Sequence, residues 1–151
     1  VLSDGLCIVR YPKGGETDYD RAAFEEYDGF SVLEAKEKPE ATVVTYGRIT
    51  ENAAAAAEKL GNVRVVKLLR LSPINTEKLG SFLVGKVFFA EEGMKNGGVG
   101  EFLSETFPEK NIYVRAVSDF TDGGSENELI REYGFDADFL EKMISESLGR
   151  V

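Results

Sequence analysis

The chain of 151 residues contains no histidine and no tryptophan, and its single cysteine is Cys7. The absence of histidine excludes Ser-His-Asp and Cys-His nucleophilic systems and most zinc sites, so any acid–base chemistry would fall to Asp, Glu, Lys or Tyr. One cysteine cannot form an internal disulfide, which suits a reducing, cytoplasmic setting. Because Cys7 lies in the apolar run from Leu6 to Val9, we expect it to be buried in a core.

The chain is also poor in the features that mediate binding to membranes and nucleic acids. No apolar run approaches the roughly 20 residues that span a bilayer. The formal net charge is −9, and no cluster of basic residues offers a surface for phosphate backbones. We therefore expect neither a membrane nor a nucleic acid among its partners. A hydrophobic content of 42% and a charged content of 30% are those of an ordinary globular domain with a sizeable core.

The stretch from Val87 to Gly100 predicts a buried strand, a glycine-rich turn and the start of a helix. Its run from Val87 to Ala90 is apolar without alternation, which is typical of a parallel strand covered on both faces. Glu91 and Glu92 follow at the carboxyl end of this strand, the edge where open α/β sheets bind ligands. Adjacent residues of a strand point in opposite directions, so we expect structural or interface roles for the two glutamates rather than shared acid–base chemistry.

The glycines between Gly93 and Gly100 match neither the dinucleotide-binding fingerprint nor a P-loop. We therefore predict a structural turn in preference to a loop that binds a ligand or partner. That second interpretation stays open, because the first amides of the following helix are able to bind an anion.

The rest of the chain predicts further strands and helices in alternation. Strands are predicted over residues 6–11, 30–35, 42–46, 63–69, 86–90 and 112–117, and helices over residues 50–61, 75–84, 99–107, 125–134 and 136–148. Strand–helix units after residue 41 indicate a mostly parallel sheet with right-handed crossovers. The short connection through Pro39 predicts an antiparallel hairpin between residues 30–35 and 42–46. The expected fold class is α/β, with three α/β/α layers and a mostly parallel sheet of about five strands, one of them antiparallel.

Capping residues mark several of the predicted helix ends. Thr50 is placed to cap the helix that ends at Gly61, and the Ser125 to Glu128 segment matches a capping box. Asp136 is placed to cap the last helix.

The segment Arg10-Tyr11-Pro12-Lys13-Gly14 carries two cations at the exit of the first predicted strand, in a chain of net charge −9. The arginine side chain offers a rigid donor fork suited to phosphate, and lysine adds a point charge. The sequence therefore favours a phosphate contact here over a merely solvated strand exit, with the rest of the site lying elsewhere.

Taken in order, these landmarks resemble the C-terminal part of the 1-deoxy-D-xylulose-5-phosphate synthase family, which belongs to the transketolase-like thiamine-diphosphate enzymes. Arg10 to Gly14 resembles the family's Arg-Tyr-Pro-Arg-Gly segment, and Pro73-Ile74 resembles part of its Lys-Pro-Leu-Asp segment. Glu91 to Gly93 followed by Gly97 to Gly100 resembles the Glu-Glu-Gly and Gly-Gly-x-Gly pattern, and Gly134 to Ala137 resembles a closing Gly-Leu-Asp-Ala. The resemblance covers nearly the whole chain.

The resemblance implies three parts of a longer enzyme. Residues 1–15 would end the middle, pyrimidine-binding domain, residues 16–29 would form a linker, and residues 30–151 would form a transketolase C-terminal-like domain. The partners would then be the remaining N-terminal and middle domains of the same enzyme, within a cytoplasmic homodimer.

The resemblance also implies an activity for the whole enzyme. Members of the family condense pyruvate with glyceraldehyde 3-phosphate, with loss of carbon dioxide, in the synthesis of isoprenoid precursors and thiamine. They use thiamine diphosphate and magnesium, and the residues that hold both, with the catalytic glutamate, lie in the two preceding domains. We therefore expect no catalytic residue, cofactor or metal in this portion, which would support the dimer and be inactive alone.

The same resemblance assigns contacts with the substrate phosphate to Arg10 and Arg70. The family's second phosphate-binding arginine falls four residues before the proline of Lys-Pro, where this chain has Leu69, and Arg70 is one place further on. A shift of one residue in a strand turns a side chain to the other face. Either the strand carries a bulge at this point or the contact is lost. Lys13 replaces the second arginine of the Arg-Tyr-Pro-Arg-Gly segment.

Two other interpretations stay open. The chain would also suit the C-terminal module of a transketolase or of a 2-oxo-acid dehydrogenase β-subunit. It would equally suit a free-standing α/β module that binds a small anion or a protein partner.

Overall fold

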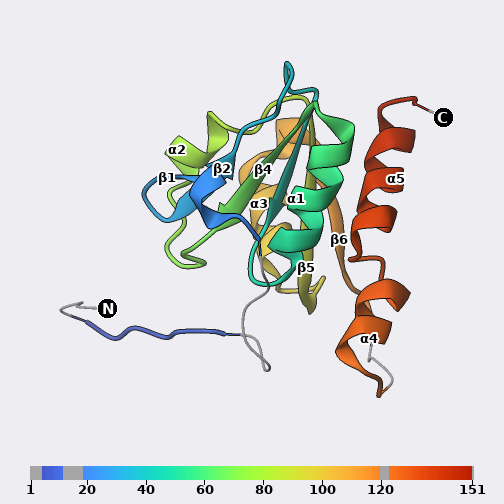
Figure 1. Cartoon of the computed structure of the whole chain (residues 1–151). Coiled ribbons are helices and arrows are strands. Elements are labelled where there is room, and N and C mark those ends of the chain that lie inside the picture. The colour runs from blue at the N-terminus through green and yellow to red at the C-terminus, as the bar shows by residue number, and fades with distance from the viewer. Residues whose placement is uncertain (1–4, 12–18, 120–122, 151) are drawn as a thin grey trace.

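The computed structural model describes residues 5–11, 19–119 and 123–150 and shows an α/β domain with helices on both faces of one sheet (Figure 1). The strands are β1 (Glu25–Glu26), β2 (Phe30–Leu33), β3 (Ala41–Thr45), β4 (Val63–Leu68), β5 (Lys86–Met94) and β6 (Tyr113–Val117). The α-helices are α1 (Ile49–Leu60), α2 (Thr76–Gly80), α3 (Val99–Thr106), α4 (Glu126–Glu132) and α5 (Ala137–Ser147). Two short 3₁₀ helices are η1 (Arg21–Ala23) and η2 (Pro108–Lys110).

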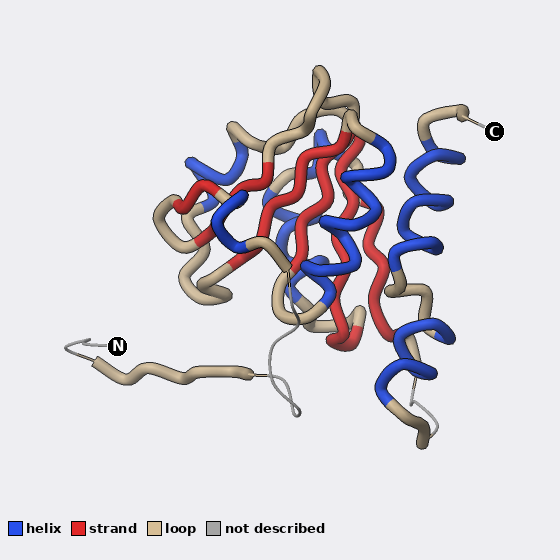
Figure 2. Tube along the Cα trace, in the orientation of Figure 1, coloured by secondary structure: helices blue, strands red, loops and turns tan. Residues whose placement is uncertain are grey.

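The sheet has six strands in the order β1-β2-β4-β3-β5-β6. Figure 2 shows the strands in red with the helices in blue around them. Strands β4, β3, β5 and β6 are parallel to one another, whereas β2 is antiparallel to β4, and β1 is antiparallel to β2. The predicted α/β class and mostly parallel sheet are confirmed. The sheet has one strand more than predicted, and β2 is the one antiparallel strand, because β1, which pairs with β2, runs in the same direction as β4.

The predicted hairpin between residues 30–35 and 42–46 is wrong, because β2 pairs with β4 and not with β3. All five residues of β3 are buried, and both of its edges are occupied by parallel neighbours, β4 and β5. A strand without alternation belongs in the middle of a parallel sheet. Strand β2 therefore pairs with the outer edge of β4, where Val32 lies opposite Val66.

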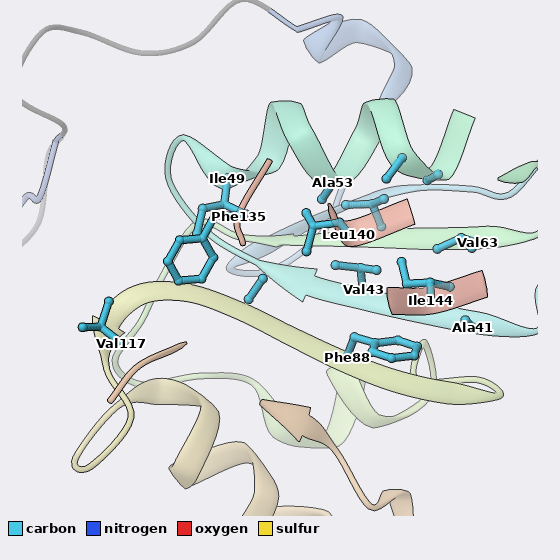
Figure 3. Packing of buried hydrophobic residues seen from close by; sticks show 14 residues of the cluster. Ala41, Val43, Ile49, Ala53, Val63, Phe88, Val117, Phe135, Leu140 and Ile144 are labelled. Carbon is cyan, nitrogen blue, oxygen red and sulfur yellow. The ribbon is translucent and has the colours of Figure 1, made fainter. Parts of the chain in front are cut away.

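The core has two halves, one on each face of the sheet. On one face, Ala53 of α1 and Leu140 and Ile144 of α5 pack over Val43 of β3 and Phe88 of β5 (Figure 3). The small alanine side chains allow α1 to approach the strands closely. On the other face, Leu79 of α2, Leu83 and Leu103 of α3 pack against the strand side chains that point to that face. This arrangement is the predicted three-layer α/β/α architecture.

Most of the helix ends that were predicted from capping residues are confirmed. Gly61 ends α1 with φ of 77°, and the side chain of Asp136 accepts a hydrogen bond of 3.0 Å from the Phe139 amide at the start of α5. The capping box from Ser125 to Glu128 is present. Thr50 was the wrong cap for α1, because the helix begins one residue earlier and the Thr50 hydroxyl donates to the Gly47 carbonyl.

The strand predicted over residues 6–11 is not formed. Residues 5–11 carry no strand assignment, and no described strand pairs with them. Cys7 is exposed rather than buried, and Leu6 and Ile8 are 95% and 82% exposed. A strand forms only where a neighbour satisfies its backbone N–H and C=O groups, and the described part of the chain supplies none here.

Among the described residues, no helix combines the length and apolar character required to cross a membrane.

Candidate functional site

The carboxyl ends of strands β4, β3 and β5 lie side by side and bring polar side chains to one edge of the sheet. Arg70 follows β4, Tyr46 follows β3, and Glu91 and Glu92 lie in the last part of β5. Because ligands of open α/β sheets bind outside the carboxyl ends of the strands, this edge is the candidate site.

Glu91 is the most buried charged residue at this edge, at 1% exposure. Its Oε1 accepts a hydrogen bond of 2.9 Å from the Gly100 amide, and its Oε2 accepts bonds from the Val99 amide at 3.2 Å and the Tyr46 hydroxyl at 3.0 Å. Glu91 was predicted at the carboxyl end of the strand, whereas β5 continues through it to Met94. The carboxylate thus fills the amino end of α3, where a free anion would otherwise bind.

The glycines of the turn let the backbone approach Glu91. A Cβ at Gly98 would lie 2.4 Å from Glu91 Oε1, and a Cβ at Gly100 would lie 2.7 Å from Cγ1 of Val114. The turn is therefore built around an internal carboxylate. This geometry matches the predicted structural turn.

Glu92 points away from Glu91 and enters a separate ionic contact, as the alternation of a strand requires. Arg48, at the amino end of α1, places its Nε 3.0 Å from Glu92 Oε1 and also contacts the Glu126 carboxylate of α4. Burial raises the pKa of Glu92 above its ordinary value, although the Arg48 charge opposes this shift. The Arg48 side chain thus links the end of β5, the start of α1 and the start of α4.

A cavity of about 310 Å³ lies beside this contact, between α1 and α4. Its walls mix the cations Arg48 and Arg131 with the acids Glu51, Glu126 and Asp136. Such a lining suits neither a diphosphate nor its metal ion. Across the described ranges, no group of three or more His, Cys, Asp or Glu residues is placed to hold a metal. The lining of this cavity therefore does not fit thiamine diphosphate with magnesium.

Arg70 lies at a bulge. The amides of Leu69 and Arg70 both donate to the carbonyl of Gly29, each at 2.9 Å, so two residues of one strand end oppose one residue of the other. A bulge of this kind re-aims the side chains that follow it. This hydrogen-bond pattern is that of a bulge, one of the two alternatives that the sequence left open, and the contact of Arg70 with a phosphate stays a prediction. The Arg70 guanidinium then reaches Asp28, with Nη2 2.7 Å from Oδ1.

Arg10 is exposed. Burial is the main cause that raises the pKa values of Tyr46 and Glu92, and the positive charge of Arg10 lowers both. The charge of Arg10 thus acts at the ends of β3 and β5, whereas Arg70 is engaged with Asp28 beyond the end of β4. Lys13 lies outside the described residues.

Asp28 is a site residue that sequence reasoning missed. It lies in the segment predicted as a linker, in which the structure has η1 and β1, and β1 pairs with β2. An aspartate followed by glycine before a strand is an ordinary turn signal, so nothing in the pattern connected Asp28 to Arg70, 42 residues further along. Asn75 caps α2, and its Oδ1 accepts a bond of 3.1 Å from the Lys78 amide.

Comparison with known proteins gives a consistent set of relatives. The chain is 26% identical to 1-deoxy-D-xylulose-5-phosphate synthase of Corynebacterium glutamicum, over 95% of this chain and 26% of that protein. It is 29% identical to the synthase of Thermotoga maritima, over 93% of this chain and 24% of that protein. The chain thus spans about a quarter of the length of the curated relatives it matches.

Solved structures agree on the fold. A split-gene transketolase, described as an inactive β4 tetramer, superposes with a TM-score of 0.73 and 28% identity, over 89% of this chain and 47% of that chain. Transketolase of Campylobacter jejuni superposes with a TM-score of 0.59 at 16% identity, over 78% of this chain and 18% of that chain, which shows the fold alone.

The family model described as "Transketolase, C-terminal domain" matches residues 31–140. That match includes β3 to β6 and every α-helix except most of α5. The chain therefore belongs to the transketolase C-terminal domain family.

Proposed function

We propose that this chain is the C-terminal part of a 1-deoxy-D-xylulose-5-phosphate synthase, the thiamine-diphosphate-dependent transferase that condenses pyruvate with glyceraldehyde 3-phosphate. The observation that carries this proposal is the bulge at Leu69 and Arg70, which provides an arginine at the carboxyl edge despite the shift of one residue. The relatives named above, which match over nearly the whole of this chain, support the same assignment.

The proposed division of the chain is residues 1–15 as the end of the middle domain, 16–29 as a linker and 30–151 as the C-terminal domain. The exposed apolar side chains of Leu6, Ile8 and Val9 support it, since they would be covered by the rest of a middle domain. In this proposal the chain supports a cytoplasmic homodimer and contributes no catalytic residue.

The proposed role of Arg10 and Arg70 is to hold the phosphate of glyceraldehyde 3-phosphate. Guanidinium groups form charge-assisted hydrogen bonds with phosphate oxygens, and both side chains are at the edge where the substrate would enter. Thiamine diphosphate and magnesium would be held by the preceding domains and would supply the chemistry of decarboxylation and carbon–carbon bond formation. The residues of this chain would bind and orient the acceptor only.

The test is a kinetic comparison in the complete gene product, assayed with pyruvate and glyceraldehyde 3-phosphate. Arg70→Gln should raise the KM for glyceraldehyde 3-phosphate by roughly 10- to 100-fold, the effect of losing charge-assisted hydrogen bonds, and should leave the KM for pyruvate unchanged. Arg70→Lys should recover part of the loss. Arg64→Gln is the matched control. Arg64 also pairs with one carboxylate, that of Glu34, but it lies within β4 and not at the carboxyl edge of the sheet.

An unchanged KM for glyceraldehyde 3-phosphate in Arg70→Gln would remove Arg70 from the proposed site. A second candidate function is the C-terminal module of a transketolase, which the match to the split-gene transketolase favours. An enzyme that transfers a two-carbon unit from a ketose phosphate, and does not use pyruvate as donor, would establish that alternative.

A further inference from the structure

The carboxylate of Asp28 is seated between donors from two separate elements. Arg70, which follows β4, donates from Nη2 to Oδ1 at 2.7 Å, and Asn75, which caps α2, donates from Nδ2 to Oδ2 at 3.2 Å. Each carboxylate oxygen therefore accepts a hydrogen bond from a different side chain. A guanidinium and an amide that converge on two oxygens of one anion form a small anion cradle.

The backbone fixes this cradle. Gly29 adopts φ of 86°, and its carbonyl accepts hydrogen bonds from the amides of both Leu69 and Arg70. A Cβ at Gly29 would lie 3.3 Å from the Arg70 Cβ, so the arginine side chain packs directly over the glycine. Asp28 and Arg70 are thus held against each other by their own backbones.

The charges around Asp28 favour an anion. The hydrogen bonds from Arg70 and Asn75 lower the pKa of Asp28, and the charge of Lys78 lowers it further. Two cations therefore face a single carboxylate, in a chain whose net charge is −9. Lys78 Nζ lies 4.9 Å from the centre of the ring of Tyr27, the residue that precedes Asp28.

The pair is also accessible to a solute. The side chains of Arg70 and Asp28 are 46% and 55% exposed. Exposed ion pairs of this kind are worth only about 0–1 kcal/mol, so an external anion can replace the carboxylate at little cost. A phosphate group carries more charge and more acceptor oxygens than a carboxylate, and it suits the guanidinium fork.

We propose that Asp28 is an internal place-holder for a phosphate group, which binds to Arg70 and Asn75 by displacing the Asp28 carboxylate. The proposal deepens the proposed function and rests on its assignment of Arg70 to the substrate phosphate. It adds Asn75 as a second phosphate-binding side chain and Asp28 as the residue that sets the affinity of the site. The cost of displacing Asp28 weakens phosphate binding, so removal of its charge strengthens binding.

The experiment is a titration of the 151-residue chain with inorganic phosphate, followed by NMR at the Nε–H group of Arg70 and at the backbone amides of Gly29 and of residue 70, which are present in every variant. Asp28→Asn should bind phosphate roughly threefold more tightly than the wild type, the size expected for the loss of one exposed competing charge. Asn75→Ser, which keeps a residue able to cap α2, should bind roughly threefold more weakly because the amide donor is lost. Arg70→Gln should abolish binding at this site.

Glu34→Gln is the matched control, because Glu34 is also about half-exposed and also accepts from one guanidinium, that of Arg64 at 2.8 Å. Glu34→Gln changes the net charge by the same amount as Asp28→Asn, but it removes a carboxylate that pairs with Arg64 rather than with Arg70. It should therefore leave the phosphate affinity near that of the wild type. Equal tightening in Glu34→Gln and Asp28→Asn would overturn the place-holder role and indicate a general charge effect.

The other outcomes separate this inference from the proposed function. If Arg70→Gln abolishes binding but Asp28→Asn does not tighten it, the place-holder role is wrong and the assignment of Arg70 stands. If Arg70→Gln leaves the phosphate affinity unchanged, the assignment of Arg70 itself fails. A wild-type chain whose Arg70 signal does not respond to phosphate would overturn the cradle, while the KM comparison in the complete enzyme still tests the proposed function.

Discussion

The carboxylate of Glu91, within strand β5, accepts a hydrogen bond of 2.9 Å from the backbone amide of Gly100, in the first turn of α3. The contact spans the glycine-rich turn and joins its two ends. The site edge is therefore shaped by an internal charge–helix contact, and the amides of Val99 and Gly100 at the start of α3 are already occupied. This leaves the arginines as the groups at that edge best suited to an external anion.

Replacing Glu91 with glutamine should destabilise the domain. The glutamine amide has one acceptor oxygen where the carboxylate has two, and its NH₂ group would face the amides that Glu91 now accepts from. We expect the free energy of unfolding to fall by about 1–3 kcal/mol in Glu91→Gln, measured by urea denaturation. Glu101→Gln is the control, because that exposed carboxylate accepts only from the Gly97 amide among the described hydrogen bonds. Equal losses in both variants would contradict a special role for the buried carboxylate.

A methyl group at Gly100 should also be costly. Its Cβ would lie 2.7 Å from Cγ1 of Val114, 2.9 Å from Cδ1 of Phe89 and 3.1 Å from Glu91 Oε1. Overpacking of a close-packed site typically costs about 1–3 kcal/mol, so Gly100→Ala should lower the midpoint of thermal unfolding. Gly123→Ala, where a Cβ would meet no heavy atom within 4 Å, should leave the midpoint near that of the wild type. A Gly100→Ala variant as stable as the wild type would show that α3 can move away from β6 without cost.

Much of the fold could be predicted because its signals are local. The run from Val87 to Ala90 identifies a buried strand by its lack of alternation, and the β-branched residues over 42–46 identify a strand, although not its place in the sheet. Gly61 and Asp136 mark helix ends through their own backbone and side-chain geometry, which needs no distant partner. The resemblance to a known family came from the order of such segments.

What could not be predicted depends on residues far apart in the chain. The position of β2 depends on which edge of the sheet remains free, and no turn residue encodes that. Cys7 lies in an apolar run, but burial requires a partner surface that the described residues do not provide. The pairing of Asp28 with Arg70 arises from a bulge that only the backbone hydrogen bonds reveal. These are tertiary effects that override local pattern.

Tyr46 should make the stability of the domain depend on pH in the alkaline range. Burial, and then the neighbouring Glu91 carboxylate, raise the pKa of the Tyr46 phenol far above its ordinary value of about 10. Above pH 10 the unfolded chain loses this proton while the folded chain keeps it, so the free energy of unfolding falls as pH rises, by at most about 1.4 kcal/mol per pH unit. Tyr46→Phe should have a smaller slope above pH 10, measured by urea denaturation at several pH values. Parallel curves for the two proteins would contradict the buried phenol as the cause.

Thiamine diphosphate should not bind to this chain by itself. The cavity between α1 and α4 mixes acids with its cations, and no described cluster of acids is placed to hold magnesium. A calorimetric titration of the chain with thiamine diphosphate and magnesium should therefore give no heat beyond that of dilution, whereas the complete gene product should bind both. The matched comparison is the same titration with magnesium alone, which separates loose attraction of the cation to a chain of net charge −9 from binding of the cofactor. Saturable binding of thiamine diphosphate to the chain would mean that Arg10, Arg70 or the turn after Glu92 forms a diphosphate site of its own, and the division of labour proposed for the enzyme would have to be redrawn.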